Sequence, residues 1–490
     1  MTLDRRDVLR LLGGGAAAAL LPSPVMARTR RAPEGTRSSE VVVVGAGFAG
    51  LCAARALTAA GLDVALLDAR DRVGGRVKGG SIAGQSVDLG GQWVGARHSR
   101  LLALLGEKGI ATTPQYLTGR SLVELNGRIH SGPKEDVSLG RAADAAMKRA
   151  LAAIRGLVAQ VPLEAPWTAP RAREWDRVTM AEWIRSETPD RDARAMLRLM
   201  VEGLYTAEPD QVSLLFFLAY VKSGGSLEQL WETEDAAQAF HVPGGIHRLA
   251  AELGRELGAR VSLGAPVDAI LQDASGVVVE SPAGAWRAGR VIVSIPLPLT
   301  ARIRYDPPLP PRRDALAQRS PMGAVIKYWV AYREPFWRRR GLNGEISSDR
   351  PPTSGFYDGS PSDAGPGLLV GFIEADAALS LSGRGMDERR RLVVGRVADL
   401  LGPEGADPID YVDNDWPSEP WTRGCYGAYM GPGTLTELGP ALAAPCGRIH
   451  WAGTETSPVW TGYIEGAIRS GERAAAEVLA AAGERRTAAV

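Results

Sequence analysis

The chain has 490 residues, of which 45% are hydrophobic and 23% are charged, so it has the composition of a globular protein and the length of two domains. The formal net charge of +1 gives no indication of a polyanionic partner, so nucleic-acid binding is not predicted. Three cysteines are too few, and odd in number, for a disulfide framework. The five histidines have no spacing suited to a metal ion, and no metal site is predicted.

Residues 1–38 are typical of a targeting segment rather than a fold element. Arg5 and Arg6 precede an apolar run over residues 11–21, and small residues for a cleavage site follow at 25–27. The run is too short to span a bilayer, and no later apolar run reaches that length, so no membrane anchor is predicted. The twin arginine indicates the export route for folded proteins, and hence a periplasmic or extracellular location. The alternative is a disordered basic tail.

The next segment predicts a βαβ unit that binds a dinucleotide. A strand, a helix and a second strand are expected over residues 40–44, 51–60 and 63–67. The first loop carries Gly45 for a tight turn, Gly47 for the approach of a pyrophosphate, and Gly50 for close packing of helix on strand. Asp68 ends the second strand, where it can accept a hydrogen bond from a ribose hydroxyl. A plain βαβ packing turn is the alternative.

The middle of the chain changes character twice. Residues 117–239 are predicted to be helical, with apolar residues at helical spacing over 180–184, 193–204 and 213–221. Strands are then expected over 261–263, 267–271, 277–280, 291–295, 325–332 and 451–453, with helices over 389–401 and 462–482. Because the nucleotide-binding pattern recurs near both ends and in the middle, the nucleotide-binding domain is predicted to be discontinuous.

Five motifs carry the functional interpretation. A loop with paired glycines, residues 70–76, follows the second strand, and a second loop spans residues 88–93. The other three lie near the C-terminus, at residues 424–426, 453–456 and 462–467. Paired glycines permit close backbone approach, and arginines can meet phosphate. Together with the βαβ unit, this set resembles the flavin-containing amine oxidase family over nearly the whole chain after Ser38. The block over residues 424–477 is most similar to the monoamine oxidases.

The resemblance implies an α/β architecture with two domains. Residues 39–116, 241–300 and 421–485 would form a Rossmann-type FAD-binding domain, and residues 117–240 and 301–420 an α+β substrate-binding domain. The residues expected to contact FAD are Gly45, Gly47, Gly50, Asp68, Arg70, Arg76, Gly90, Gly91, Gln92, Trp93, Val267, Trp421, Cys425, Glu455 and Ile464. The family usually has glutamate where this chain has Asp68, and the shorter acid is expected to reach the ribose as well.

Three further roles follow from the resemblance. Cys425 falls where monoamine oxidases bind the flavin through a thioether, whereas a buried inert cysteine is the alternative. Tyr426 and Tyr463 match the paired tyrosines that orient the amine in front of the flavin. Lys327 interrupts an apolar strand and matches the lysine that a water molecule bridges to the flavin N5, where it helps oxygen react. A solvent-facing lysine is the alternative there.

The substrate cavity is expected to be lined by Leu204, Tyr205, Trp231, Gln238 and Tyr357. Aromatic residues at these positions favour an arylalkylamine. A diamine would require an acid deep in the cavity, and Glu202, Glu232 or Glu234 could supply one. No cation that would hold an amino-acid carboxylate is identifiable, and no general base is evident.

These observations predict FAD-dependent oxidation of a primary, arylalkyl amine to an imine and then an aldehyde, with release of ammonia and hydrogen peroxide. Molecular oxygen or a redox carrier would take the electrons. A polyamine or L-amino-acid oxidase or dehydrogenase on the same scaffold is the nearest alternative. A non-catalytic flavin-binding redox or assembly protein and a nicotinamide dehydrogenase are alternatives of other classes. A homodimer is retained beside a monomer as the oligomeric state.

Overall fold

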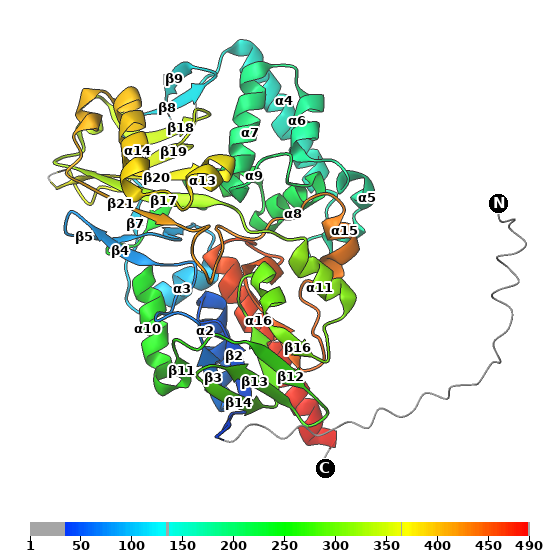
Figure 1. The fold of residues 1–490 in the computed structure, drawn as a ribbon. Coiled ribbons are helices and arrows are strands. Elements are labelled where there is room, and N and C mark those ends of the chain that lie inside the picture. Colours follow the sequence, from blue (N-terminus) through cyan, green and yellow to red (C-terminus); the bar gives the residue numbers. More distant parts are fainter. Residues whose placement is uncertain (1–34, 134–136, 364, 489–490) are drawn as a thin grey trace, which may run out of the picture.

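The computed structural model describes residues 35–133, 137–363 and 365–488, and the predicted twin-arginine segment lies almost wholly outside them. These residues form two lobes (Figure 1). One lobe holds a parallel sheet with its helices, and the other holds a seven-stranded sheet and a group of helices. This arrangement confirms the predicted α/β class and the Rossmann-type unit. The residue bounds of the two domains stay predictions.

The parallel sheet has the strand order β11-β3-β2-β15-β22, and all its neighbours run parallel. Its strands are β2 (Val41–Val44), β3 (Val64–Leu67), β11 (Val261–Ser262), β15 (Arg290–Val293) and β22 (Ile449–Trp451). Val41 and Val43 pack into the core on one face, and Val42 and Val44 pack into the core on the other. Burial of both faces explains why β2 is an uninterrupted valine run.

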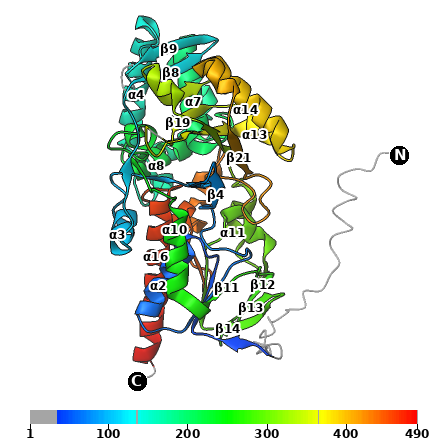
Figure 2. The ribbon, with the colours of Figure 1, turned by 90° about the vertical axis from the view of Figure 1, so that its left-hand side faces the viewer.

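Helices cover one face of this sheet and a second sheet covers the other, as Figure 2 shows. The helices are α2 (Phe48–Ala59), α3 (Ser99–Glu107), α10 (His247–Leu257) and α16 (Ile464–Ala488). Helix α16 packs along α2, so the last helix of the chain lies beside the first one described. The covering sheet has the order β1-β14-β13-β12-β16. Its strands are β1 (Arg37–Ser38), β12 (Ala269–Gln272), β13 (Val277–Ser281), β14 (Gly284–Ala288) and β16 (Arg304–Asp306).

The seven-stranded sheet has the order β21-β17-β20-β19-β18-β8-β9. Its strands are β8 (Arg120–Leu125), β9 (Arg128–Gly132), β17 (Val325–Tyr332), β18 (Leu342–Ser348), β19 (Gly355–Asp358), β20 (Gly367–Glu374) and β21 (Asp410–Asp415). Alternate residues of β17, among them Ile326 and Tyr328, pack in one core with α14 (Met386–Leu401). Val325 packs on the opposite face with Phe372 and Cys425. The period of two therefore places Lys327 on the same face as Val325.

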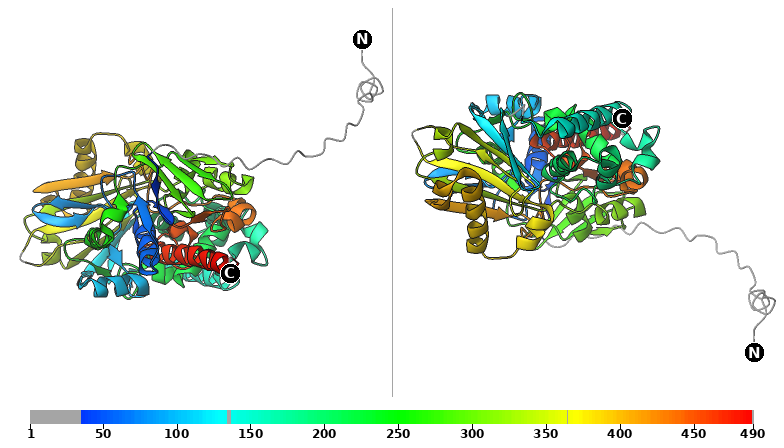
Figure 3. Two further views of the ribbon diagram at one scale, coloured as in Figure 1. Left: turned by 90° about the horizontal axis from the view of Figure 1, so that it is seen from below. Right: turned by 90° about the horizontal axis from the view of Figure 1, so that it is seen from above.

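Helices stand beside this sheet in the second lobe (Figure 3). They are α4 (Arg141–Val158), α5 (Ala172–Trp175), α6 (Met180–Glu187), α7 (Arg191–Tyr205), α8 (Leu214–Gly224) and α9 (Leu227–Trp231), with α11 (Pro311–Gln318) and α15 (Thr434–Leu438). They share one large apolar core. The expectation that residues 117–239 are helical is wrong at its start, because β8 and β9 form a hairpin that extends the sheet. Residues 180–184, 193–204 and 213–221 are helical as predicted.

Short elements complete the chain. They are β4 (Gly79–Ile82), β5 (Gln85–Asp88), β6 (Trp93–Val94), β7 (Thr113–Pro114), β10 (Phe240–His241), α12 (Phe336–Arg339) and α13 (Ala375–Leu381). Short 3-10 helices include η4 (Leu297–Arg302) and η7 (Thr454–Thr456). Among the described helices, none is both long and apolar enough to cross a membrane.

Candidate active site

One large cavity, of about 310 Å³, is lined by residues of both lobes. The parallel-sheet lobe contributes the loops after β2, β3 and β15 and the start of α16. The other lobe contributes residues of α7, α8, α9, β17, β19 and β20. The cavity therefore joins a glycine-lined groove to an aromatic chamber.

The glycine loop is shaped so that no side chain fits there. Gly45 has a φ of +100°, and a Cβ on it would lie 2.9 Å from the Ser294 hydroxyl oxygen. A Cβ on Gly75 would lie 3.2 Å from the Gly47 Cα, because the two loops cross at that point. Phe48 and Ala49, the first residues of α2, line the groove. A helix N-terminus behind a glycine loop offers backbone N–H groups to a phosphate. The cradle fits the pyrophosphate of a dinucleotide cofactor.

Asp68 organises the loop and also faces the cavity. Its carboxylate accepts hydrogen bonds from the Ala46 N–H at 2.7 Å and from the Arg70 N–H at 2.9 Å. The Arg70 guanidinium donates to the Thr422 hydroxyl and so ties this loop to the C-terminal block. A carboxylate accepts about four hydrogen bonds, which leaves Asp68 capacity for ribose hydroxyls.

The partly buried Arg76 and the buried Glu455 form an ion pair at the wall of the cavity. The two Arg76 Nη atoms donate to the two Glu455 carboxylate oxygens at 2.6 and 3.1 Å, and Nη1 also donates to the Tyr426 carbonyl at 2.8 Å. Burial disfavours the Glu455 carboxylate, but the Arg76 guanidinium outweighs this and holds the pKa of Glu455 below its usual value. Arg76 lines the cavity, whereas Glu455 does not.

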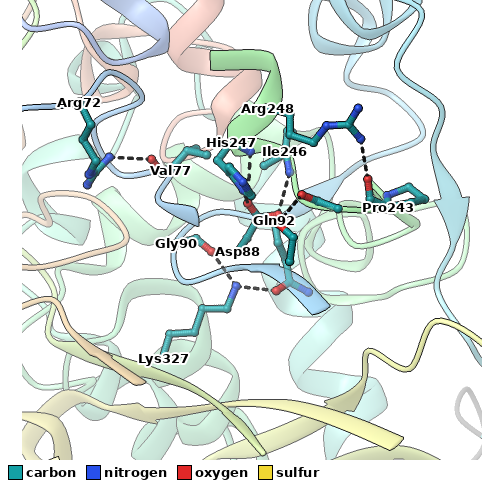
Figure 4. A network of polar contacts seen from close by, with 12 residues as sticks. Arg72, Val77, Asp88, Gly90, Gln92, Pro243, Ile246, His247, Arg248 and Lys327 are labelled. Carbon is teal, nitrogen blue, oxygen red and sulfur yellow. Dashed lines mark hydrogen bonds and ion pairs between the residues drawn. The ribbon is translucent and has the colours of Figure 1, made fainter. Parts of the chain in front are cut away.

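Lys327 points into the cavity between two loop residues (Figure 4). Its ammonium donates to the Gly90 carbonyl at 2.6 Å and to the Gln92 side-chain oxygen. Only 2% of the residue is exposed, and burial lowers the pKa of Lys327 to about 7 although the Asp88 carboxylate opposes the change. Asp88 in turn accepts from the His247 ring and from the Ile246 N–H. The solvent-facing alternative for Lys327 is wrong.

Cys425 is buried at the wall of the cavity. Burial raises the pKa of its thiol to about 12, against the lowering effect of Arg76 and Arg70. Its backbone is fixed on both sides, because its N–H donates to the Gly323 carbonyl at 2.9 Å and its carbonyl accepts from the Thr206 hydroxyl. At neutral pH the side chain is therefore a protonated thiol at the cofactor groove.

Aromatic rings line the chamber next to Cys425 and Lys327. Tyr426 meets Phe372 edge-on with ring centroids 6.0 Å apart, and Trp93 meets Tyr357 edge-on at 5.2 Å. Tyr463 lines the chamber from the start of α16 and contacts Trp460 at 5.2 Å. Burial raises the pKa of both Tyr426 and Tyr463, so both phenols are protonated at physiological pH. Neutral ring faces of this kind attract an amine nitrogen.

One acid in the chamber was missed from the sequence. Glu374, the last residue of β20, lines the cavity and is 7% exposed. One of its carboxyl oxygens accepts from the Tyr426 hydroxyl at 2.9 Å, and the other accepts from the Ser354 hydroxyl. Burial raises its pKa to about 7. The acids named from the sequence, Glu202, Glu232 and Glu234, do not line the cavity.

Most of the predicted site residues meet at this cavity. Those in its wall are Gly45, Gly47, Asp68, Arg70, Arg76, Gly90, Gly91, Gln92, Trp93, Val267, Trp421, Cys425 and Ile464, with Leu204, Trp231, Gln238, Tyr357, Lys327, Tyr426 and Tyr463. Gly50, Tyr205 and Glu455 stand outside the wall. Tyr205 follows Leu204 on α7, so its ring is turned about 100° away and packs against Tyr220 at 4.8 Å.

Several wall residues carried no sequence signal. Phe372 and Glu374 come from β20, Tyr220 from α8, and Arg302 from η4. Only the pairing of distant strands and helices brings them to the cavity. Tyr220 lies in a largely apolar helix, so its sequence context predicts a core residue rather than a cavity residue.

Comparison with known proteins places these features in a family. The model for flavin-containing amine oxidoreductases matches residues 48–479. A Mycobacterium tuberculosis protein named as a flavin-containing monoamine oxidase, AofH, is 43% identical over 443 residues, which are 90% of this chain and 96% of that protein. An L-amino acid dehydrogenase of Synechocystis is 36% identical over 456 residues, covering 90% of this chain and 95% of the relative.

A solved structure has the same architecture. Putrescine oxidase bound to putrescine superposes with a TM-score of 0.87 at 34% sequence identity, over 91% of this chain and 100% of that one. The family match begins at the first residue of helix α2, directly after Gly45 and Gly47, and it covers Lys327 and the Cys425 and Tyr463 regions together. The chain therefore belongs to the flavin-containing amine oxidoreductase family, and it is an oxidoreductase.

Proposed function

We propose that the protein uses FAD to oxidise primary arylalkylamines. Bound FAD would supply the two-electron acceptor for the α-carbon of the amine. The imine then hydrolyses in water to an aldehyde and ammonia, and molecular oxygen takes the electrons to give hydrogen peroxide. The observation that carries this proposal is the chamber itself, where Trp93, Tyr357 and Phe372 join the Tyr426 and Tyr463 rings directly beside the glycine cradle.

The residues divide the work in this proposal. The rings of Tyr426 and Tyr463 orient the amine nitrogen, since the π system of each ring carries negative electrostatic potential on its faces. Trp231, Leu204 and Tyr357 supply apolar surface for the rest of the substrate. Lys327, with a pKa of about 7, is held by Gly90 and Gln92 at the junction of chamber and groove, where it can carry a proton during reoxidation.

The charges in the chamber favour an amine over an amino acid. From α7, α9, β19 and β20, the only charged residue in the wall of the described cavity is Glu374, and the nearby cation of β17, Lys327, is already held by Gly90 and Gln92. An amino-acid carboxylate would meet this acid without a cation from the same elements, and like charges in a buried site repel. A diamine is the second candidate, because Glu374 could receive a second ammonium group.

Anaerobic mixing with three substrates tests the proposal. Purified protein with FAD is mixed with 2-phenylethylamine, 1,4-diaminobutane or L-phenylalanine, and loss of the visible flavin band is followed. We expect 2-phenylethylamine to reduce the flavin fastest, and admitted oxygen to yield hydrogen peroxide. Reduction of the flavin by 1,4-diaminobutane alone would show that the substrates are diamines and not arylalkylamines. Reduction by L-phenylalanine alone would make the protein an amino-acid dehydrogenase or oxidase.

We also propose a covalent thioether between Cys425 and the flavin. Its support is a buried thiol in the wall of the groove, held from both sides by Gly323 and Thr206. The bond would replace the thiol S–H and one C–H of a flavin methyl group, with two electrons passing to the ring system. Acid precipitation would then give a yellow pellet that is colourless in Cys425→Ala. Cys446→Ala is the matched control, because Cys446 does not line the cavity. Yellow colour in the wild-type supernatant would contradict the tether.

Export is a further proposal, supported by Arg5, Arg6 and the apolar run over residues 11–21. Cell fractionation of the natural host should find the protein outside the cytoplasm. Replacing both arginines by lysine should retain it inside, since the charge stays the same and only the guanidinium groups are lost. Equal export of both forms would contradict the twin-arginine route.

A further inference from the structure

Glu374 occupies an unusual electrostatic position. It lies at the end of β20, where Val325 of β17 stands opposite, and its carboxyl group faces the cavity. Both of its recorded hydrogen-bond donors are neutral hydroxyls, those of Tyr426 and Ser354. Among the described residues, no arginine, lysine or histidine lies within ion-pair distance of it. A buried carboxylate without a cation is unfavourable, because hydroxyl groups replace only part of its hydration.

The groups packed around Glu374 do not repair this deficit. Tyr426 and Tyr357 face it from the chamber, and Tyr328 lies near it on β17. Glu202 of α7 is a nearby acid rather than a cation, and its own pKa is raised mainly by burial, with a smaller contribution from Glu374. Lys327 lies on the same face of β17 but donates to Gly90 and Gln92. The missing counter-ion must therefore come from what enters the cavity.

Its hydrogen bond links Glu374 directly to the expected amine position. The Tyr426 ring is one of the two that would orient the amine, and its hydroxyl donates to Glu374. Alkylamines enter solution as ammonium ions, whose pKa is about 10 for a lysine-like amine, whereas the oxidised form must be the free amine. A proton must therefore leave the nitrogen before oxidation, and Glu374 is the acid in the chamber wall that can accept it.

We propose that the Glu374 carboxylate binds the substrate's ammonium group and accepts the proton that the nitrogen loses before oxidation. One N–H bond breaks and one carboxyl O–H bond forms, so an ammonium and a carboxylate become a neutral amine and a neutral acid. The proton passes to water after product leaves. This inference rests on the proposed function, because it requires an amine substrate, and it makes Glu374 a catalytic residue for that reaction. The pKa of about 7 suits an acid that gains and loses a proton near neutral pH.

The test compares a charged ligand with a neutral one of the same shape. Binding of 2-phenylethylamine and of 2-phenylethanol is followed under anaerobic conditions by the perturbation of the flavin spectrum, before reduction, in wild type and Glu374→Gln. Glutamine can still accept from Tyr426, so the chamber keeps its shape. We expect amine binding at pH 8 to weaken about tenfold or more, as for loss of a charged hydrogen bond, while alcohol binding stays within about twofold. Glu202→Gln is the matched control, because Glu202 is a nearby buried acid outside the cavity wall.

The pH profile gives a second readout that a structural role would not alter. In wild type, log(kcat/KM) should rise with pH up to about 7, where Glu374 ionises, and then level off until the amine itself titrates. In Glu374→Gln the rise should continue without this break, because only the free amine then binds. Glu374→Asp keeps the charge and should retain the break in the pH profile. This variant provides the test if Glu374→Gln does not fold.

The outcomes separate the two proposals. Equal weakening of amine and alcohol would mean that Glu374 only shapes the chamber, and unchanged amine binding would mean that it carries no role in recognition. Either result overturns this inference while wild-type reduction by amines still stands. Absence of reduction by any amine in the wild type would instead overturn the proposed function.

Discussion

Burial moves the pKa values of two ionisable residues toward each other at the cavity. It raises the pKa of Glu374 and lowers that of Lys327, both to about 7. They stand on adjacent strands, β20 and β17, and on the same face of the seven-stranded sheet. Near neutral pH each can therefore be neutral or charged at little cost, which is the condition for moving protons in a dry site.

Glu374 should make stability depend on pH. Its raised pKa means that the folded state favours the protonated carboxyl group. The free energy of unfolding is therefore highest below about pH 4.5, and it falls as the pH rises through about 7, where Glu374 ionises. We expect Glu374→Gln to be more stable than wild type at pH 8, on the order of 1–3 kcal/mol, with the difference vanishing toward pH 4.5. Urea unfolding at several pH values measures this. Glu234→Gln, at an exposed position, should match wild type throughout, and a constant difference would contradict the assigned titration.

The two residues differ in how far the sequence could predict them. Lys327 is a lone charge in a run of β-formers, which made it conspicuous in the sequence, but its expected role came from the family resemblance and its burial from the structure. Glu374 ends its strand and reads as an ordinary strand terminus, and the Tyr426 hydroxyl that defines its role comes 52 residues later in the chain. Of the two neighbouring residues predicted to line the cavity on α7, Leu204 does so and Tyr205 does not, because one residue along a helix turns the side chain to another face.

At the scale of elements, the βαβ unit depends on one close approach. A Cβ on Gly50 would lie 1.8 Å from the Gly45 carbonyl oxygen and 2.8 Å from the Ser294 hydroxyl oxygen. The first turn of helix α2 can therefore pack this closely against the loop only because residue 50 has no side chain. Gly50 does not line the cavity, but it holds the loop that does.

Gly50→Ala should push α2 away from the loop. We expect the free energy of unfolding to fall by about 3 kcal/mol or more, because the added Cβ clashes with backbone atoms and no rotamer change can relieve the clash. Flavin content and urea unfolding of the purified variant measure it. Gly156→Ala in the last turn of α4 is the control, since a Cβ there meets nothing within 4 Å and should stabilise by about 0.5–1 kcal/mol. Normal flavin content and stability in Gly50→Ala would disprove the packing argument.

Elements differ in how visible they are in the sequence. Strands β2 and β3 are buried on both faces and are continuous apolar runs, and β17 is apolar on both faces except at Lys327, so all three can be predicted from the sequence. Strand β8 pairs with β18, more than 200 residues later, and that pairing leaves no local pattern. Strand β9 pairs only with β8 and is largely exposed or half-buried. The Asn126-Gly127 turn between β8 and β9, with positive φ at both residues, is the local hairpin signal that was overlooked in the sequence.

At the scale of the molecule, the Arg76–Glu455 pair joins segments 379 residues apart. Glu455→Gln would leave the partly buried Arg76 guanidinium without its counter-ion, although its hydrogen bond to the Tyr426 carbonyl would remain. We expect a loss of about 1–3 kcal/mol of stability, as for a charged hydrogen bond, because the guanidinium is partly exposed to the cavity. Urea unfolding with simultaneous flavin fluorescence measures it. Glu174→Gln, which breaks the exposed pair with Arg171, should leave both transitions unchanged. A loss of similar size in both variants would remove any special role of the Arg76–Glu455 pair.

The position of the last strand and helix also sets the order in which the molecule can be made. The parallel sheet receives β22 only when residue 451 has left the ribosome, and α2 acquires its neighbour α16 later still. At about 5–20 residues per second, the first βαβ unit would wait for roughly 20–80 s with part of its apolar surface uncovered. During that time it is a substrate for chaperones and has no complete groove for a nucleotide. Cofactor capture must therefore be a post-translational event, and the yield of active enzyme should depend on how long the nascent N-terminal half is protected.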